Sequence, residues 1–161
     1  MQRRDFFKKA GVAIFAAVVA PSMLSAEDFR KTKPAAWKVK NDQKAKKPSL
    51  DATDEAIKDL FGTDKTSKGS INLKAPEIAE NGAVVPISFS TKLNASKIAV
   101  FQSANPETTV AVFTVHEKSI PNYSIRIKMQ KTGYVTVVAE ADGKLYKVSK
   151  LVKVTIGGCG G

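Results

Sequence analysis

The second half of the chain alternates between apolar and polar residues with a period of two. In VVPISFS (84–90), Val85, Ile87 and Phe89 fall on one face and the serines on the other, and YSIRIKM (123–129) alternates in the same way. Further runs of strand length are KIAVF, TVAVFTV, YVTVVAE and KLYKVSKLVKVTI. Because about seven short strands follow one another without a crossover helix, the pattern predicts a mainly β fold, an antiparallel β-sandwich over residues 71–156.

Two positions predict how the strands are connected. Asp142-Gly143 stands between two apolar runs and favours a two-residue β-hairpin. Pro86 has no N–H to donate to a ladder, so the segment around it is expected to be an edge strand or to begin after Pro86. An open edge needs a cover, which a partner subunit, a bulge or charged neighbours would supply.

One short helix is predicted before the sheet, in SLDATDEAIKDLFG (49–62). Thr53 or Asp51 is the expected N-cap, and Gly62 lies just past the expected end. The helix has one apolar face, formed by Ala56, Ile57, Leu60 and Phe61. That face must dock on another surface. Together with the edge at Pro86, it favours a sandwich that a partner covers.

The positive charge is concentrated in a lysine-rich stretch ahead of this helix. From Arg30 to Lys47 there are eight basic residues against Asp42 alone, whereas residues 48–161 hold 14 basic and 11 acidic residues. We therefore interpret residues 27–70 as a solvated lysine-rich extension followed by the short helix, with acidic partners or anions as its targets. A folded basic surface is missing from this pattern, which argues against a nucleic-acid partner.

The N-terminus reads MQRRDFFKKAGVAIFAAVVAPSMLSA, a basic start followed by an apolar run from Val12 to Ala20. The run is shorter than the roughly 20 residues that span a bilayer, so residues 1–26 are predicted to be a signal peptide cleaved after Ala26, with no stable membrane insertion. Arg3-Arg4 followed by DFFK is typical of a twin-arginine signal. We expect export by that route to the periplasm.

The C-terminus, VTIGGCGG, contains the only cysteine of the protein. A single cysteine in an oxidising compartment indicates an intermolecular bond or a working thiol. Cys159 stands between two pairs of glycines, Gly157, Gly158, Gly160 and Gly161. Because glycine has no Cβ and a permissive backbone, residues 157–161 are predicted to form a thin, flexible arm that carries the thiol beyond the last strand.

The sequence offers no catalytic machinery. His116 is the only histidine, so no histidine cluster exists for a metal site. A nucleophilic pair would require His116 to meet Cys159 on its glycine-flanked tail, and the sequence nominates no Ser-His-Asp set. Its place at the end of TVAVFTV favours a surface histidine near a turn. We predict no catalytic, metal-binding or cofactor-binding residue in this chain, which makes it a non-catalytic carrier and not an enzyme.

The ending VKVTIGGCGG, with APEIAENGAVVPISFS (75–90), DEAIKDLFG and the twin-arginine start, resembles the SoxY family of the periplasmic thiosulfate-oxidising system. The resemblance implies an immunoglobulin-like sandwich that forms a heterodimer with a Z subunit. It also implies that Cys159 carries sulfur intermediates between a haem-containing thiosulfate-coupling enzyme, a manganese-dependent sulfate-releasing hydrolase and, where present, a sulfane dehydrogenase. Haem and manganese would belong to those partners, so no cofactor is expected here.

Two other functions fit the same tail. An exported structural sandwich would use Cys159 only for an intermolecular disulfide. A thiocarboxylate sulfur carrier would use the terminal Gly160-Gly161, but such carriers are activated by ATP in the cytoplasm, and the export signal argues against that site of action.

Overall fold

The computed structural model describes residues 33–155. The predicted signal peptide and the predicted arm lie outside these residues. The elements of the described part are η1 (a 3₁₀ helix, Ala35–Trp37), α2 (Asp51–Phe61), β1 (Thr66–Ser67), β2 (Ile71–Lys74), β3 (Ile78–Ala79), β4 (Val85–Thr91), β5 (Ala95–Gln102), β6 (Thr109–Thr114), β7 (Asn122–Ile127), β8 (Gly133–Ala141) and β9 (Lys144–Val154).

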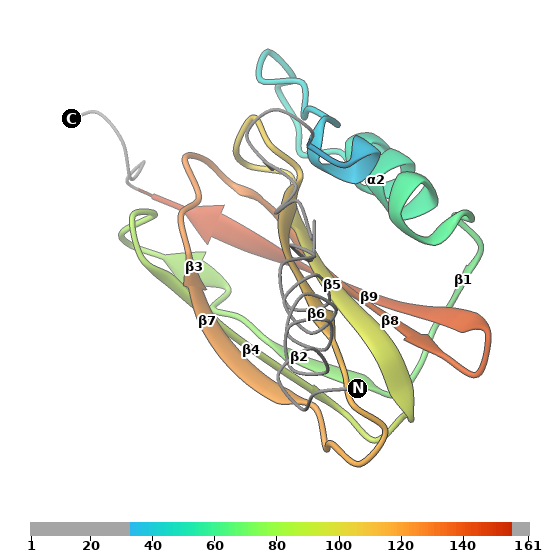
Figure 1. Ribbon diagram of the computed structural model, residues 1–161. Coiled ribbons are helices and arrows are strands. Elements are labelled where there is room, and N and C mark those ends of the chain that lie inside the picture. The colour runs from blue at the N-terminus through green and yellow to red at the C-terminus, as the bar shows by residue number, and fades with distance from the viewer. Residues whose placement is uncertain (1–32, 156–161) are drawn as a thin grey trace, which may run out of the picture. The chain divides into compact units, whose positions relative to one another are not determined.

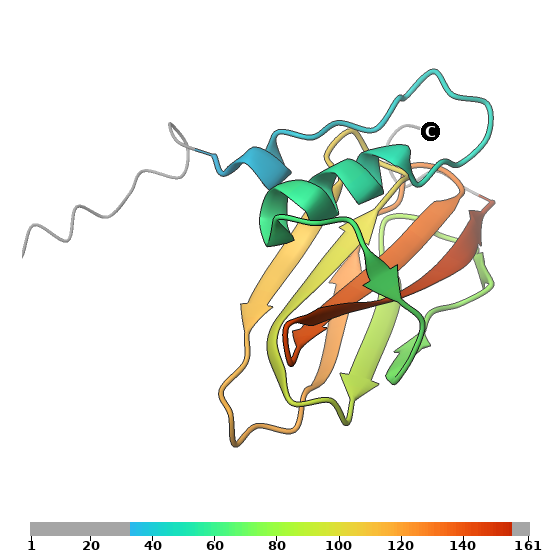
Figure 2. The same ribbon diagram turned by 90° about the vertical axis from the view of Figure 1, so that its right-hand side faces the viewer.

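The strands form two sheets that pack face to face (Figures 1 and 2). The larger sheet has the order β1-β9-β8-β5-β6, with β3 also paired to β9, and the smaller has the order β2-β4-β7. The long ladders are antiparallel, which confirms the predicted mainly β sandwich. Two short strands, β1 and β3, add to β9 in parallel, and they were not predicted from the sequence.

The main core lies between the sheets and follows the alternation in the sequence. Val85, Ile87 and Phe89 of β4 point inward and are at most 2% exposed. They pack against the inward face of β5 and β8, formed by Ile98, Val100, Val135, Val137 and Ala139. Burying these side chains supplies most of the driving force for the fold, at about 1.5–3 kcal/mol for each large apolar side chain.

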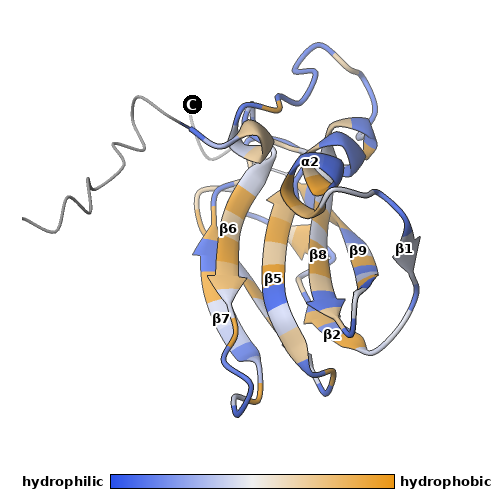
Figure 3. Ribbon diagram, turned by 45° about the vertical axis from the view of Figure 1, so that its right-hand side comes forward, coloured by the Kyte–Doolittle hydropathy of each residue, from blue (hydrophilic) through white to orange (hydrophobic). Residues whose placement is uncertain are grey.

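The outer face of the larger sheet is covered by α2 (Figure 3). Ala56 and Ile57 of the helix are fully buried and pack on a second cluster that includes Ala99, Phe101 and Val138 of the sheet. Strands β5 and β8 are therefore buried on both faces, which explains why their sequences are nearly continuous apolar runs. The predicted apolar helix face is confirmed, but it docks on its own sandwich, so it provides no argument for a partner.

The C-terminal end of α2 matches the prediction from the sequence, and the N-terminal end does not. Gly62 follows the helix with φ 78°, and its N–H donates to the Lys58 carbonyl, as predicted for a C-cap. The N-cap prediction is wrong: the cap residue is Leu50, and it makes no side-chain cap bond. Asp51 and Thr53, the two predicted caps, both lie within the helix. The hydroxyl of Ser49, outside the helix, accepts the Asp51 N–H at 3.0 Å.

The lysine-rich segment is not simply a solvated extension. Its lysines are exposed, but Ala36, Val39 and Asn41 are buried against the sandwich. The hydroxyl of Thr109 donates to the Ala36 carbonyl at 2.6 Å, so the start of β6 holds η1 in place. The segment is part of the folded domain from η1 onward.

Pro86 lies in the central strand of the smaller sheet, so the prediction of an edge strand, or of a strand that begins after Pro86, is wrong. The ladder with β2 ends at Lys74 opposite Ser88, whereas the ladder with β7 continues to Val85. Pro86 is exposed, and it is paired with β7 but not with β2. A strand position that is paired on one side only tolerates the missing N–H of proline.

The predicted hairpin at Asp142-Gly143 is confirmed. The two residues join β8 to β9, with Ala141 opposite Lys144. Both have positive φ, 51° at Asp142 and 69° at Gly143, as the favoured type I′ turn requires.

Candidate functional site

The predicted site is the arm, and its residues follow directly on the described chain. Cys159, the predicted attachment residue, and the four glycines of the predicted arm, Gly157, Gly158, Gly160 and Gly161, lie outside residues 33–155. Their role stays a prediction. The structure does describe the place from which the arm departs, which is the end of β9 at Val154 and Thr155. We call these two residues the arm root.

The arm root is held from both sides by hydrogen bonds. The N–H of Val154 donates to the hydroxyl of Thr132 at 3.0 Å. On the β3 side, Thr155 N–H donates to the Ala79 carbonyl at 3.2 Å, following the parallel pairing of β3 with β9. Because buried or paired backbone groups fix a strand in its sheet, β9 stays ordered to its last residues. The arm therefore starts from a fixed base.

The connection from β2 to β4, residues 75–84, forms one wall of this base. The side-chain oxygen of Asn81 accepts the N–H of Ala83 at 2.8 Å, which closes a tight turn, and the carbonyl of Gly82 accepts the N–H of Met129 at 2.7 Å. The closeness of this segment to the end of β9 was not predicted from the sequence. The Asn81-Gly82 pair signals the turn, but nothing in the sequence signals the pairing with β9.

Two large apolar side chains are exposed on this same wall. Ile78 is 57% exposed and pairs with Lys153 of β9, and Val84 is 53% exposed. Apolar surface therefore lies directly beside the arm root.

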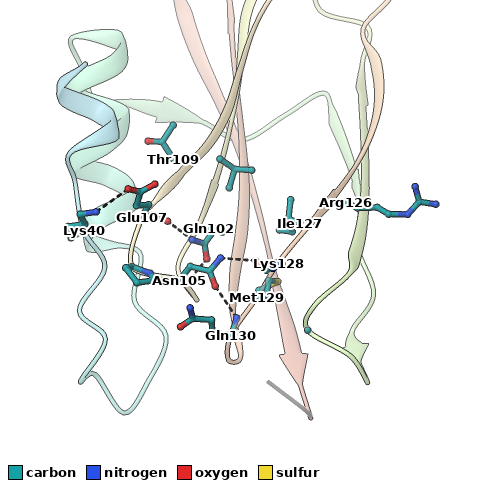
Figure 4. Close-up of a pocket in the computed structure, with 13 residues that line it drawn as sticks. Lys40, Gln102, Asn105, Glu107, Thr109, Arg126, Ile127, Lys128, Met129 and Gln130 are labelled. Atoms are coloured by element: carbon teal, nitrogen blue, oxygen red, sulfur yellow. Dashed lines mark hydrogen bonds and ion pairs between the residues drawn. The ribbon is translucent and has the colours of Figure 1, made fainter. Parts of the chain in front are cut away.

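A second set of hydrogen bonds ties together the connections at the same end of the sandwich (Figure 4). The Asn105 side chain donates to the Lys128 carbonyl at 2.8 Å and accepts from the Gln130 N–H at 2.9 Å. The Gln102 side chain donates to the Glu107 carbonyl and accepts from the Asn105 N–H at 2.8 Å. The β5–β6 and β7–β8 connections thus support each other.

A cavity of about 520 Å³ opens between β6 and β7 beside these side chains. Its amide side chains, Gln102 and Asn105, are already engaged with the backbone, and Figure 4 shows Arg126 pointing away from the other lining residues. The Thr109 hydroxyl in its lining donates to the Ala36 carbonyl, and the Glu107 carboxylate pairs with Lys33 and Lys40. The geometry therefore gives this cavity no catalytic arrangement.

One exposed ion-pair cluster fastens the lysine-rich segment to the sandwich. Glu107 accepts from Lys33 at 3.0 Å and from Lys40 at 3.2 Å. Hydrogen bonds from Lys33 and then Lys40, with the charges of both, lower the pKa of Glu107 below its usual value. Glu107 is therefore ionised over the physiological range.

The described residues also bear on metal and membrane binding. Between Lys33 and Thr155, no three His, Cys, Asp or Glu side chains are grouped so that they could hold a metal ion. His116 is exposed and its Nδ1 accepts the Lys118 N–H at 3.3 Å, which confirms the predicted surface histidine. Neither helix of this part of the chain has the length and apolar character needed to cross a bilayer.

The comparisons with known proteins agree with this arrangement. The family model for sulfur oxidation protein SoxY matches residues 57–159, which include the predicted attachment cysteine. The solved structure of the sulfur carrier protein SoxY from Chlorobium limicola f thiosulfatophilum is 42% identical and covers 63% of this chain and 90% of its own, with a TM-score of 0.60. No curated protein matches.

A weaker likeness involves a superoxide reductase (neelaredoxin) from Ignicoccus hospitalis. It is 15% identical over 54% of this chain and 81% of its own, with a TM-score of 0.48, too low to bear on function. The family match covers well over half of the chain. The chain belongs to the SoxY family of sulfur oxidation proteins.

Proposed function

We propose that this protein is a covalent sulfur carrier in thiosulfate oxidation, with Cys159 as the attachment point. The observation that carries the proposal is the single cysteine between two glycine pairs, directly beyond a strand that is anchored to its last described residues. Family membership and the solved sulfur carrier from Chlorobium limicola support the same function.

The arm suits transfer between enzymes. Cys159 is four residues beyond Thr155, so an extended backbone carries its thiol about 14 Å from the sheet. Four glycines leave the thread without side chains, which allows it to enter a narrow channel. The fixed arm root makes the reach of the thiol depend on the arm alone.

The chemistry on the thiol balances with two partner reactions. In the first, the thiolate of Cys159 and the outer sulfur of thiosulfate form an S–S bond, giving a cysteine S-thiosulfonate, and two electrons pass to the haem-containing coupling enzyme. In the second, water attacks the sulfonate sulfur in the manganese-dependent hydrolase. The bond between the sulfonate sulfur and the sulfane sulfur breaks, whereas the bond formed to Cys159 stays. Sulfate and two protons leave, and the bonding pair remains on the sulfane sulfur as a cysteine persulfide.

The remaining roles follow from the same proposal. The chain is non-catalytic, because both reactions use groups held by partner enzymes, and it binds no haem or manganese itself. It forms a heterodimer with a Z subunit and works in the periplasm after twin-arginine export. A sulfane dehydrogenase, where present, would oxidise the persulfide further.

Replacing the arm residues tests the proposal. We expect Cys159→Ser to abolish thiosulfate-dependent sulfur loading, and the Gly157→Val, Gly158→Val double variant to reduce it strongly, because β-branched side chains stiffen and thicken the thread. Both variants should keep the circular dichroism spectrum of the wild type. Full activity in the folded double variant would contradict the role of a thin, flexible arm.

A further inference from the structure

Several exposed lysines gather near the arm root. Within residues 33–155, Lys33 and Lys40 pair with Glu107, whereas Lys44, Lys46 and Lys47 are exposed and form no ion pair. The β7–β8 connection adds two more basic residues. We call the resulting group the lysine rim: Lys44, Lys46, Lys47, Lys128 and Lys131.

Direct contacts place the lysine rim beside the arm root. Lys131 Nζ donates to the Gln43 carbonyl at 3.0 Å, which joins the β7–β8 connection to the lysine-rich segment. The next residue, Thr132, accepts the N–H of Val154 at 3.0 Å. Figure 2 shows the loop before α2 and the end of β9 at the same end of the sandwich. The rim therefore borders the base from which the arm starts.

The short reach of the predicted arm limits which surface the lysine rim can contact. With about 14 Å between Thr155 and the thiol, Cys159 enters the interior of an enzyme only when this end of the sandwich lies against that enzyme. Surface around the arm root then faces the entrance of the channel. The opposite end of the sandwich, at the Asp142-Gly143 turn, faces away.

The arrangement of charges favours a protein surface over a small anion. A hollow of about 250 Å³ lies between Lys47 and Lys131, but Asp42, Asp51 and Glu55 also line it, so a small anion there would meet three carboxylates. The other rim lysines are spread over exposed loops. Dispersed exposed charges act mainly by steering a complementary surface at distances up to the Debye length, about 8 Å at physiological salt.

We propose that the lysine rim docks against an acidic surface around the channel entrance of the enzyme that receives the arm. This proposal rests on the proposed carrier function. The rim sets the rate of productive encounter, and the thiol chemistry follows once the arm has entered. Complementary charge of this kind raises association rates and orients the partners.

The test compares two triple variants that remove the same charge from opposite ends of the molecule. The rim variant is K44Q/K46Q/K47Q. The control is K92Q/K118Q/K144Q, which changes three exposed lysines at the other end: one on the β4–β5 connection, one on the β6–β7 connection and one at the start of β9. Sulfur loading of each carrier, in complex with its Z subunit, is measured with the purified thiosulfate-coupling enzyme at increasing NaCl. Alkylation of Cys159 by iodoacetamide reports the accessibility of the thiol without an enzyme.

We expect the rim variant to lower kcat/KM for the carrier about tenfold at low salt and to flatten its salt dependence. Its kcat at saturation and its alkylation rate should match the wild type, and the control should change kcat/KM less than about twofold. Equal losses in both variants would overturn the proposal, since net charge alone would then be responsible.

Other outcomes also decide against the rim. A raised KM for thiosulfate, with an unchanged KM for the carrier, would assign the lysines to a small anion. Rim-dependent binding to phosphatidylglycerol vesicles with unchanged kcat/KM would assign them to a membrane surface. If the rim variant is loaded with sulfur as well as the wild type, the rim proposal fails and the proposed carrier function stands. A wild type that is never loaded would overturn the carrier function, and the rim proposal with it.

Discussion

The two ends of the sandwich are built differently, although the same strands run through both. At the end away from the arm root, β8 and β9 are joined by a two-residue turn and β4 and β5 by three residues. The β6–β7 connection at that end is longer, with seven residues. At the arm-root end the connections are held to each other by side chains, those of Asn41, Gln102, Asn105 and Thr132. The polar side chains thus fix the end of β9, whereas the described residues of the other end have fewer such bonds, among them that from the Thr91 hydroxyl to the Ser70 carbonyl at 2.6 Å.

The largest effect is expected at Gly133, the first residue of β8. A Cβ there would lie 2.9 Å from both the backbone nitrogen and the Cβ of Ala104. Because backbone cannot move as a flexible side chain does, Gly133→Ala should destabilise the protein by about 3 kcal/mol. Urea unfolding measures this. Adding Ala104→Gly should restore only part of the loss, since the contact with the backbone nitrogen remains.

Full rescue by Ala104→Gly would show that only the two Cβ atoms collide. No loss at all in Gly133→Ala would show that the β5–β6 connection is free to shift, which contradicts the tightly held arm-root end.

The next largest effect is expected at Asn41. Its side-chain amide donates to the carbonyls of Gln102 and Asn105, both at 2.9 Å, and the side chain is buried. Asn41→Ala leaves these carbonyls without that donor and should cost about 2 kcal/mol. Asn122→Ala, at an exposed asparagine of β7, is the matched control and should be nearly neutral. Equal costs in thermal unfolding would remove the distinction between the two ends.

A smaller effect is expected at Gly143, in the turn at the other end. No atom lies within 4 Å of a Cβ built there, so Gly143→Ala suffers only the strain of φ 69°, about 1 kcal/mol. Gly143→Asn should recover most of it, because asparagine tolerates this conformation. Sulfur loading should not change in either variant. A loss of loading would show that this end also contributes to function.

The smallest effect concerns Glu107 and depends on pH. Hydrogen bonds from Lys33 and Lys40 lower its pKa in the folded state, so its contribution to stability is present above the unfolded-state pKa and disappears as the pH falls through the lowered value. Exposed ion pairs contribute little, so Glu107→Gln should cost below about 1 kcal/mol near neutral pH. The stabilities of the two proteins should converge in acid. A difference that persists in acid would contradict the electrostatic origin.

The periodic parts of this fold were predictable from the sequence, because each strand reports its own buried face. The alternation at Ile87 and Phe89, the turn at Asp142-Gly143 and the apolar face of α2 needed only local information. The place where α2 docks depends on residues that are distant in the sequence. The sequence therefore could not show that the apolar face of the helix packs on its own sandwich.

The support of the arm root was not predictable for the same reason. Asn41 bonds to the Gln102 carbonyl across 61 residues, and Thr132 bonds to Val154 across 22. Single side chains that bond to distant backbone leave no period in a sequence. The burial of Val39 within a lysine-rich stretch was missed likewise, because its partners come from the sheet. Cys159, the predicted attachment residue, was conspicuous as the only cysteine in the sequence.

Intact-mass spectrometry decides whether Cys159 carries the sulfur. The mature protein with its Z subunit is incubated with thiosulfate and the thiosulfate-coupling enzyme, and then digested to locate the adduct. We predict a thiosulfonate on the C-terminal peptide that a thiol reductant removes, and a persulfide after the sulfate-releasing hydrolase is added. A thiol that stays free throughout turnover, or a mass that corresponds only to a disulfide-linked dimer, would contradict the carrier function.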